Sequence, residues 1–157
     1  HLYRGKGGFF ESHALKAGLI WFSHTKNGRP LVDDIYRARW DGTQRANITR
    51  SPGTWEEHGE PSPNGSLITF NSSRGFDWKN PPDTAKTLRL ELWARRTRTG
   101  NITRLTDFNQ QLTGSARVLT SDYAWGPFGR EIAVYYATFG RNSVTQKIDI
   151  LRLDQAY

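Results

Sequence analysis

The segment from Pro61 to Ser72, which reads Pro-Ser-Pro-Asn-Gly-Ser-Leu-Ile-Thr-Phe-Asn-Ser, decides the fold of this chain. Its first half contains Pro63, Asn64 and Gly65, which are turn-forming residues, because proline restricts φ to about −65° while asparagine and glycine tolerate positive φ. Its second half alternates side chains in the manner of a half-buried strand. The segment therefore predicts a tight turn that leads into an antiparallel strand.

The same alternation recurs twice, in the segments 18–23 and 130–135, and the later one follows a comparable turn from Gly126 to Gly129. Each of the three strands is followed by a second strand-like run, and these runs are 34–40, 90–96 and 148–153. Tyr36, Trp93 and Ile150 within them are spaced by 57 residues and again by 57. Internal repetition at this period is typical of repeat architectures.

Two further segments complete the repeating unit. A short run containing Asn-Ile-Thr-Arg follows the second strand in the first two units, at 47–50 and 101–104. One more short strand precedes each turn, at 9–14, 56–60 and 120–125. A unit of four short antiparallel strands is the blade of a β-propeller. We therefore predict an all-β fold of about three blades, approximately 8–50, 51–106 and 107–157, which would be a partial or incomplete ring.

These residues resemble the repeats of TolB-like, WD-like β-propellers. The segment Pro61 to Ser72 is similar to the "SPDGk-I-F-S" core of such repeats, and Leu92 to Thr106 is similar to the strand, turn and Arg-Leu-Thr that continue it. The chain departs from the pattern where Asn64 and Phe128 replace the usual aspartate of the turn. The resemblance implies a bacterial periplasmic or extracellular protein, in a family whose propellers serve as envelope scaffolds, as non-catalytic peptidase domains and as polysaccharide lyases.

The number of predicted strands is eleven, because the third unit lacks the last strand of the other two. About four to eight blades are needed to close a ring. We therefore expect that more protein completes it, either a missing N-terminal half of the propeller, which we favour, or other protein subunits. The absence of methionine agrees with a processed or partial chain.

Composition excludes several functions. The chain has no cysteine, so it has no thiolate metal site and no cysteine nucleophile. It also lacks a Gly-x-Ser-x-Gly segment, which argues against serine-peptidase chemistry in these residues. The net charge of +7 suits anionic partners, but the basic residues are scattered, so a nucleic-acid surface is not favoured. No apolar run is long enough for a transmembrane helix.

The candidate binding residues lie on the strands that the resemblance makes innermost. Glu57 and His58 in the second unit, and Ser121 and Asp122 in the third, are predicted to face the central channel and to hold a cation or a polar ligand. The alternative is that they hydrogen-bond neighbouring strands and channel water. No pair of histidines or acids has a recognised ligand spacing, so we predict neither a metal site nor a cofactor.

The long irregular segment between Arg74 and Thr87 is predicted to be a surface insertion. Phe76 and Trp78 within it are not needed by a packed blade, and they are therefore candidates for contact with a partner. Taken together, the sequence favours a non-catalytic propeller scaffold that binds other proteins in an extracytoplasmic or envelope assembly. The alternatives are an enzyme of the polysaccharide-lyase or hydrolase type with its site in the channel, and a module that binds polyanions.

Overall fold

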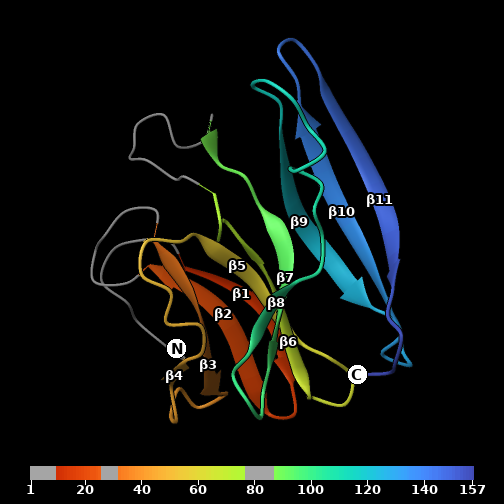
Figure 1. Cartoon of the computed structure of the whole chain (residues 1–157). Helices are drawn as coiled ribbons and strands as arrows, with labels where there is room; N and C mark the ends of the chain where they lie inside the picture. Colours follow the sequence, from red (N-terminus) through yellow and green to blue (C-terminus); the bar gives the residue numbers. More distant parts are fainter. Residues whose placement is uncertain (1–9, 26–31, 77–86) are drawn as a thin grey trace.

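The computed structural model describes residues 10–25, 32–76 and 87–157. The eleven elements that these residues form are all β-strands, arranged in three antiparallel sheets (Figure 1). This confirms the predicted all-β fold class, and the sheets are consistent with partial propeller blades. The described part of the chain contains no helical segment with the length and apolar character that crossing a membrane requires.

The strands follow the chain from sheet to sheet. The first sheet has the order β1 (Phe10–Lys16), β2 (Leu19–Thr25), β3 (Asp33–Arg39) and β4 (Ala46–Asn47). The second sheet has the order β5 (Glu56–Pro61), β6 (Leu67–Ser72), β7 (Glu91–Arg96) and β8 (Ile102–Arg104). The third sheet consists of β9 (Arg117–Trp125), β10 (Glu131–Phe139) and β11 (Val144–Arg152), with β10 in the middle. The sheets fall within the three predicted units, whose boundaries remain a prediction.

The turn within the segment from Pro61 to Ser72 joins β5 to β6. The Ser62 N–H donates to the Leu67 carbonyl at 2.9 Å, and the Gly65 N–H donates to the Ser62 carbonyl at 2.9 Å. Gly65 has a φ of 73°, a conformation that glycine adopts without strain. The corresponding turn between β9 and β10 has the same two bonds, from the Gly126 N–H to the Glu131 carbonyl and from the Gly129 N–H to the Gly126 carbonyl.

A buried carboxylate holds the end of each of the first two sheets. In the first sheet, the Asp34 carboxylate accepts bonds from the Asn47 amide at 2.6 Å and from the Ser51 N–H at 2.8 Å. The Thr49 hydroxyl lies 3.4 Å from the same carboxylate and accepts the Ile35 N–H at 3.0 Å. These bonds attach the chain that follows β4 to the start of β3.

The second sheet repeats this arrangement 57 residues later. The Glu91 carboxylate accepts bonds from the Thr106 hydroxyl, from the Phe108 N–H at 3.2 Å and from the Asn109 N–H at 2.7 Å. The Thr106 hydroxyl in turn accepts the Leu92 N–H at 2.9 Å. We call each set of bonds a carboxylate clasp, centred on Asp34 in the first sheet and on Glu91 in the second.

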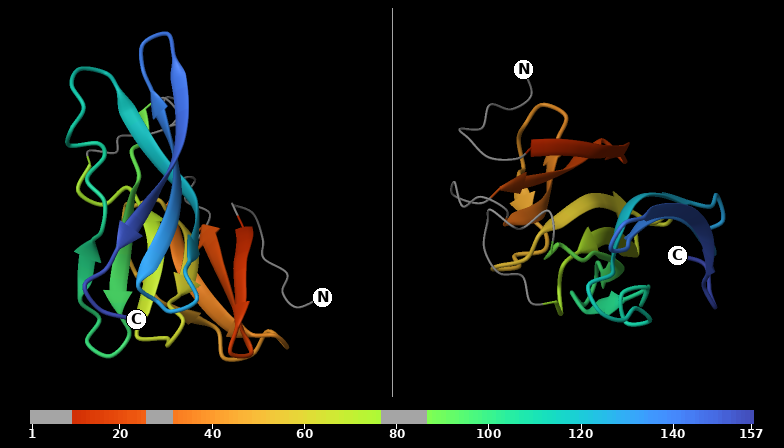
Figure 2. Two further views of the ribbon diagram at one scale, coloured as in Figure 1. Left: turned by 90° about the vertical axis from the view of Figure 1, so that its right-hand side faces the viewer. Right: turned by 90° about the horizontal axis from the view of Figure 1, so that it is seen from above.

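The sheets pack face to face, and the first strand of each new sheet lies on the face of the preceding sheet (Figure 2). Trp21, Ile35, Ile68 and Phe70 form the core between the first and second sheets. Leu92, Ile132 and Val134 form the core between the second and third sheets. The tryptophans that the repeat predicts as core residues, Trp21, Trp93 and Trp125, all belong to these two clusters.

The outer strand of the third sheet differs from the register that the sequence spacing suggests. Trp93 pairs with Phe70, three residues after the start of β6, and Asp149 pairs with Val134, three residues after the start of β10. Asp149 rather than Ile150 therefore occupies the position equivalent to Trp93. Because side chains alternate along a strand, this shift of one residue places Ile150 on the face opposite to the one that Trp93 occupies in its sheet. Half of the Ile150 surface is exposed there (50%).

Candidate functional site

The first strands of the three sheets, β1, β5 and β9, lie together, since β5 contacts both of the others. Each of the three pairings has an irregularity. His13 is an extra residue in β1, His58 and Gly59 occupy the shift in β5, and Ser121 and Asp122 occupy the shift in β9. A β-bulge redirects side chains and is frequent beside binding sites. The sequence alternation alone does not reveal these bulges.

The bulges bring together Glu11, His13, Glu57, His58 and Asp122, which we call the inner-strand cluster. His58 is its centre: its Nε2 lies 3.5 Å from Oδ1 of Asp122 and 3.8 Å from Oε1 of Glu11, and its Nδ1 lies 3.6 Å from Oε1 of Glu57. One imidazole thus contacts carboxylates from all three sheets. The His58 side chain is 20% exposed.

The carboxylates determine the charge of His58. Burial by itself lowers the pKa of His58, but the hydrogen bond and charge of Glu57, together with the charges of Glu11 and Asp122, raise it above its ordinary value. The protonated imidazole then balances part of the surrounding negative charge. The cluster can therefore take up a proton and present it to a ligand.

His13 has the opposite behaviour. Burial, with a smaller contribution from the charge of His58, lowers the pKa of His13 to about 3. Its Nε2 accepts the backbone N–H of His58 at 3.1 Å and lies 2.5 Å from the Ser23 hydroxyl. A ring nitrogen that accepts an N–H carries no proton, so neutral His13 holds its proton on Nδ1. His13 therefore acts as a structural acceptor that supports the bulge at His58.

An acidic side chain nearby is also perturbed. The Asp33 carboxylate accepts the Thr25 hydroxyl at 2.6 Å. Burial raises the pKa of Asp33 to about 6, because it outweighs that bond and is reinforced by the charges of Glu57, Asp34 and Glu11. Asp33 and His58 are thus two neighbouring groups whose pKa values are both raised, and perturbed pKa values of this kind are common at functional sites.

Hydrogen bonds between the sheets hold the cluster in place. The Tyr123 hydroxyl reaches the carbonyls of His58 and Thr69, and burial raises the pKa of Tyr123. The Asn71 amide donates to the Ser121 carbonyl at 2.6 Å, and the Trp55 indole donates to the Glu57 carboxylate at 2.7 Å. The site is thus positioned by the second and third sheets together.

Glu11, His13 and His58 also form a group of metal-ligand type, with ligand atoms within 4.8 Å of one another. Two of these residues already have other contacts, since His13 accepts the His58 N–H and the His58 ring contacts three carboxylates. A cation here would have to compete with them. The group did not emerge from ligand spacing because Glu11 and His13 are 45 or more residues away from His58.

The structure brings three of the four predicted channel residues into contact. The carboxylates of Glu57 and Asp122 both face His58. Ser121 contributes only its backbone carbonyl, which accepts a hydrogen bond from the Asn71 amide. Their role in binding a ligand remains a prediction. Glu11 was missed, although the repeat placed its segment, 9–14, in the same inner position as 56–60, and that equivalence was the signal that could have revealed it.

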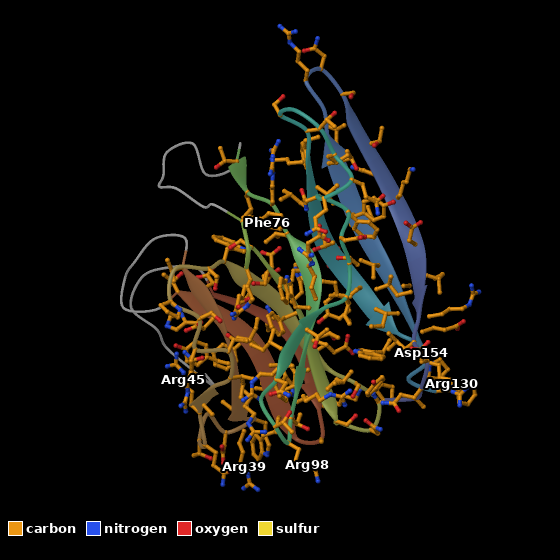
Figure 3. All side chains as sticks on the ribbon, in the orientation of Figure 1. Arg39, Arg45, Phe76, Arg98, Arg130 and Asp154 are labelled. Atoms are coloured by element: carbon orange, nitrogen blue, oxygen red, sulfur yellow. The ribbon has the colours of Figure 1, made fainter. Side chains whose placement is uncertain are left out.

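The predicted contact residues of the long insertion are only partly described. Phe76 is half-buried near the middle of the view in Figure 3, and its N–H donates to the Ser73 carbonyl at 3.1 Å. Trp78 lies outside the described residues. The contact role of the pair therefore remains a prediction.

Comparison with known proteins supports the fold. No protein-family model matches the sequence, and no curated protein matches it. The structure is similar to TolB from Acinetobacter baumannii, with 20% identity and a TM-score of 0.54, over 92% of this chain and 33% of that one. It is also similar to the GH74 enzyme of Niastella koreensis, with 15% identity and a TM-score of 0.47, over 84% of this chain and 20% of that one.

The chain therefore spans about a third of the length of the TolB structure and a fifth of the GH74 enzyme. At 20% identity, the likeness to TolB defines the architecture and leaves the activity open. The class of the protein is thus an all-β protein with a propeller-like fold.

Proposed function

We propose that the chain is a non-catalytic, protein-binding part of a β-propeller scaffold, and that its third sheet is covered by another protein β-sheet. The observation that carries this proposal is the exposed outer strand β11. Val144, Ile148 and Ile150 are 57%, 67% and 50% exposed and lie on one face of it. An exposed edge strand with apolar side chains is a template for association.

The same face continues across the sheet. Ile148 pairs with Tyr135, and Ile150 pairs with Ala133, so the exposed side chains stand beside further apolar ones. In the first two sheets, the strands equivalent to β11 are paired with β4 and β8 and contribute to the cores. This contrast supports a covering sheet, supplied either by further blades of the same propeller or by another protein subunit.

We place this scaffold in an extracytoplasmic or envelope assembly, in the periplasm or outside the cell. The support is the resemblance of the Pro61 to Ser72 repeat to TolB-like propellers, whose members serve in such assemblies. The similarity of folds agrees with that resemblance.

Hydrogen exchange on the intact native protein tests the proposal. If a sheet covers this face of β11, the strand cannot fray, so the amides of residues 144–150 that bond to β10 exchange slowly, at rates comparable to those of β10. Rapid exchange of those amides in the native assembly would overturn it. Dilution or mild denaturant then distinguishes another protein subunit from further blades of the same chain. A partner subunit dissociates on dilution, and a blade of the same chain does not.

A pair of substitutions adds an independent test. Ile148→Lys with Ile150→Lys places two charges on the covered face, so we expect the association, or the protection of β11, to weaken by about tenfold or more. Phe128→Lys is the matched control, because Phe128 is 82% exposed in the turn before β10. Equal effects of the double variant and the control would contradict the proposal.

An enzyme of the polysaccharide-lyase or hydrolase type is the second candidate, and the inner-strand cluster is the observation that favours it. A protonated His58 beside carboxylates has the composition of a general acid with its partners. Turnover of an acidic or neutral polysaccharide that is abolished by His58→Asn would favour this function over the scaffold. Absence of turnover would remove this function, and turnover that persists in the variant would show that His58 is not its general acid.

A further inference from the structure

A groove between the first two sheets has a composition that the repeat does not explain. It has a volume of about 500 Å³ and is lined by residues of β3, β4, β6, β7 and β8 and of the adjoining turns. Arg37, Arg50 and Arg95 are among the lining residues, and none of the lining residues is acidic or aromatic. We call it the arginine groove.

The three guanidinium groups lack acidic partners in the part of the chain that the structure describes, where the ion pairs of arginine involve Arg74 and Arg152. The Cζ atom of Arg37 lies 6.0 Å from the centroid of the Trp21 ring. Arg95 lies against Gly100, where an added Cβ would be 3.1 Å from its Nη2. The absence of a side chain at Gly100 therefore makes room for a guanidinium group in the groove.

The other polar side chains of the groove already have partners within the protein. The Asn47 amide donates to Asp34 at 2.6 Å and to the Tyr36 hydroxyl at 3.1 Å. The Thr97 hydroxyl donates to the Ser66 carbonyl at 3.0 Å. The arginines are thus the groups that can still donate hydrogen bonds to a ligand.

The next groove, between the second and third sheets, provides an internal control. Arg95 pairs with the second residue of β6, and Leu151 pairs with the second residue of β10, so Leu151 is its equivalent. Arg37 and Ala94 correspond in the same way, since each pairs with the third residue of the second strand. Leu151 packs into the core there, and the remaining space is only about 100 Å³. The fold therefore does not require arginine at these positions.

We propose that the arginine groove binds a small, multiply charged oxyanion that carries carboxylate or phosphoryl groups. Guanidinium groups form paired hydrogen bonds with such oxygens. The volume matches the range of pockets for small ligands. The lining has no aromatic side chain on which a base could stack, and this disfavours nucleic acid.

The surrounding charge supports this ligand class. Arg39 and Arg98 lie at the same lower end of the first two sheets (Figure 3). Both residues are exposed, and the chain as a whole carries a charge of +7. A positive field of this kind raises the local concentration of anions and falls with ionic strength.

Calorimetric titration of the purified intact protein at low ionic strength tests the site, with pyrophosphate and citrate as separate probes. We expect at least one probe to bind, and the tighter one distinguishes phosphoryl from carboxylate ligands. Arg95→Leu combined with Arg37→Ala installs the residues of the neighbouring groove, and it should weaken binding by about tenfold or more. Arg95→Lys keeps the positive charge but removes the guanidinium group that donates paired hydrogen bonds, so it should weaken binding less than the double variant.

Arg141→Ala is the matched control, because Arg141 is exposed in the turn between β10 and β11 and its removal changes the net charge without touching the groove. Unchanged circular dichroism establishes that each variant is folded. Binding that survives the double variant, an equal loss in Arg141→Ala, or no binding of either probe would overturn the proposal.

Discussion

The first two sheets and the third sheet share a strand order but end differently. Asp34 pairs with His24, Glu91 with Ser72 and Lys147 with Tyr136, and each partner lies five residues after the start of the second strand of its sheet. The clasp carboxylate of the first two sheets is thus replaced by an exposed lysine in the third.

The carboxylate at this position therefore accompanies a chain segment that returns past the end of the sheet. A buried carboxylate is costly to desolvate, and it is stabilised only when N–H and O–H groups surround it. Asp34 and Glu91 have these donors because the chain returns past them after β4 and β8. In the third sheet, no described segment returns past Lys147. A carboxylate at this position would therefore have no N–H or O–H groups from which to accept hydrogen bonds.

The largest expected effect comes from removing a clasp. Glu91→Ala leaves the Thr106 hydroxyl and the N–H groups of Phe108 and Asn109 without their acceptor, so we expect the free energy of unfolding to fall by about 3 kcal/mol or more. Urea unfolding measures it. Glu131→Ala is the control, since its ion pair with Arg152 is exposed and should contribute less than about 1 kcal/mol. Similar losses in both variants would break the comparison.

An intermediate effect is expected at the contact between the first two sheets. A Cβ on Gly59 would lie 2.3 Å from Cγ2 of Ile35, which is fully buried. Gly59→Ala should therefore cost about 1–3 kcal/mol, because the packed core must shift. Gly126→Ala is the control in the third sheet, where the nearest atoms would be 3.4 Å away, an ordinary contact. A neutral Gly59→Ala in thermal unfolding would show that the two sheets separate easily.

The smallest effect concerns pH at the place where all three sheets meet. The pKa of His58 is raised in the folded state, so its contribution to stability is complete below about pH 6.5, the value of the unfolded chain, and is lost as the pH rises through the folded value. His58→Asn removes the titration and suits the φ of 55° at this position.

The stability difference between the wild type and His58→Asn should therefore be larger at about pH 6 than at about pH 9. The ionisable groups that face the His58 ring are Glu57, Glu11, Asp122 and His13, the Asn71 amide lies 3.4 Å from its Nδ1, and all of these groups remain in both proteins. Urea unfolding at several pH values measures the difference. A difference in unfolding free energy that stays constant, or that increases with rising pH, would contradict the conclusion that the surrounding carboxylates stabilise protonated His58.

Local patterns in the sequence predicted most of the strands and the turns. The Pro-Asn-Gly and Pro-Phe-Gly turns and the strands around them formed within a few residues of their predicted places, because turn chemistry and alternation act over short distances. The register of β11 was the exception, since a one-residue difference in the hairpin before it changes no local pattern and yet reverses the face.

The candidate site was only partly predictable for a related reason. Glu57, His58 and Asp122 were predicted as channel residues, whereas Glu11 was not, and both Glu11 and Asp122 approach His58 only after β1 and β9 have packed against β5. The bulges at His13 and His58 depend on contacts between strands, and no composition rule marks them. The arginine groove likewise joins residues of two repeats whose sequences give no indication of a shared cavity.

The amino-acid sequence by itself determined the all-β class, most of the strand segments and the turn positions, because each depends on the conformational preferences of neighbouring residues. Only the tertiary structure decided which side of β11 is apolar, which carboxylates surround His58 and which arginines share a groove. These features depend on the packing of one sheet on the next, and that packing joins residues that are far apart in the chain.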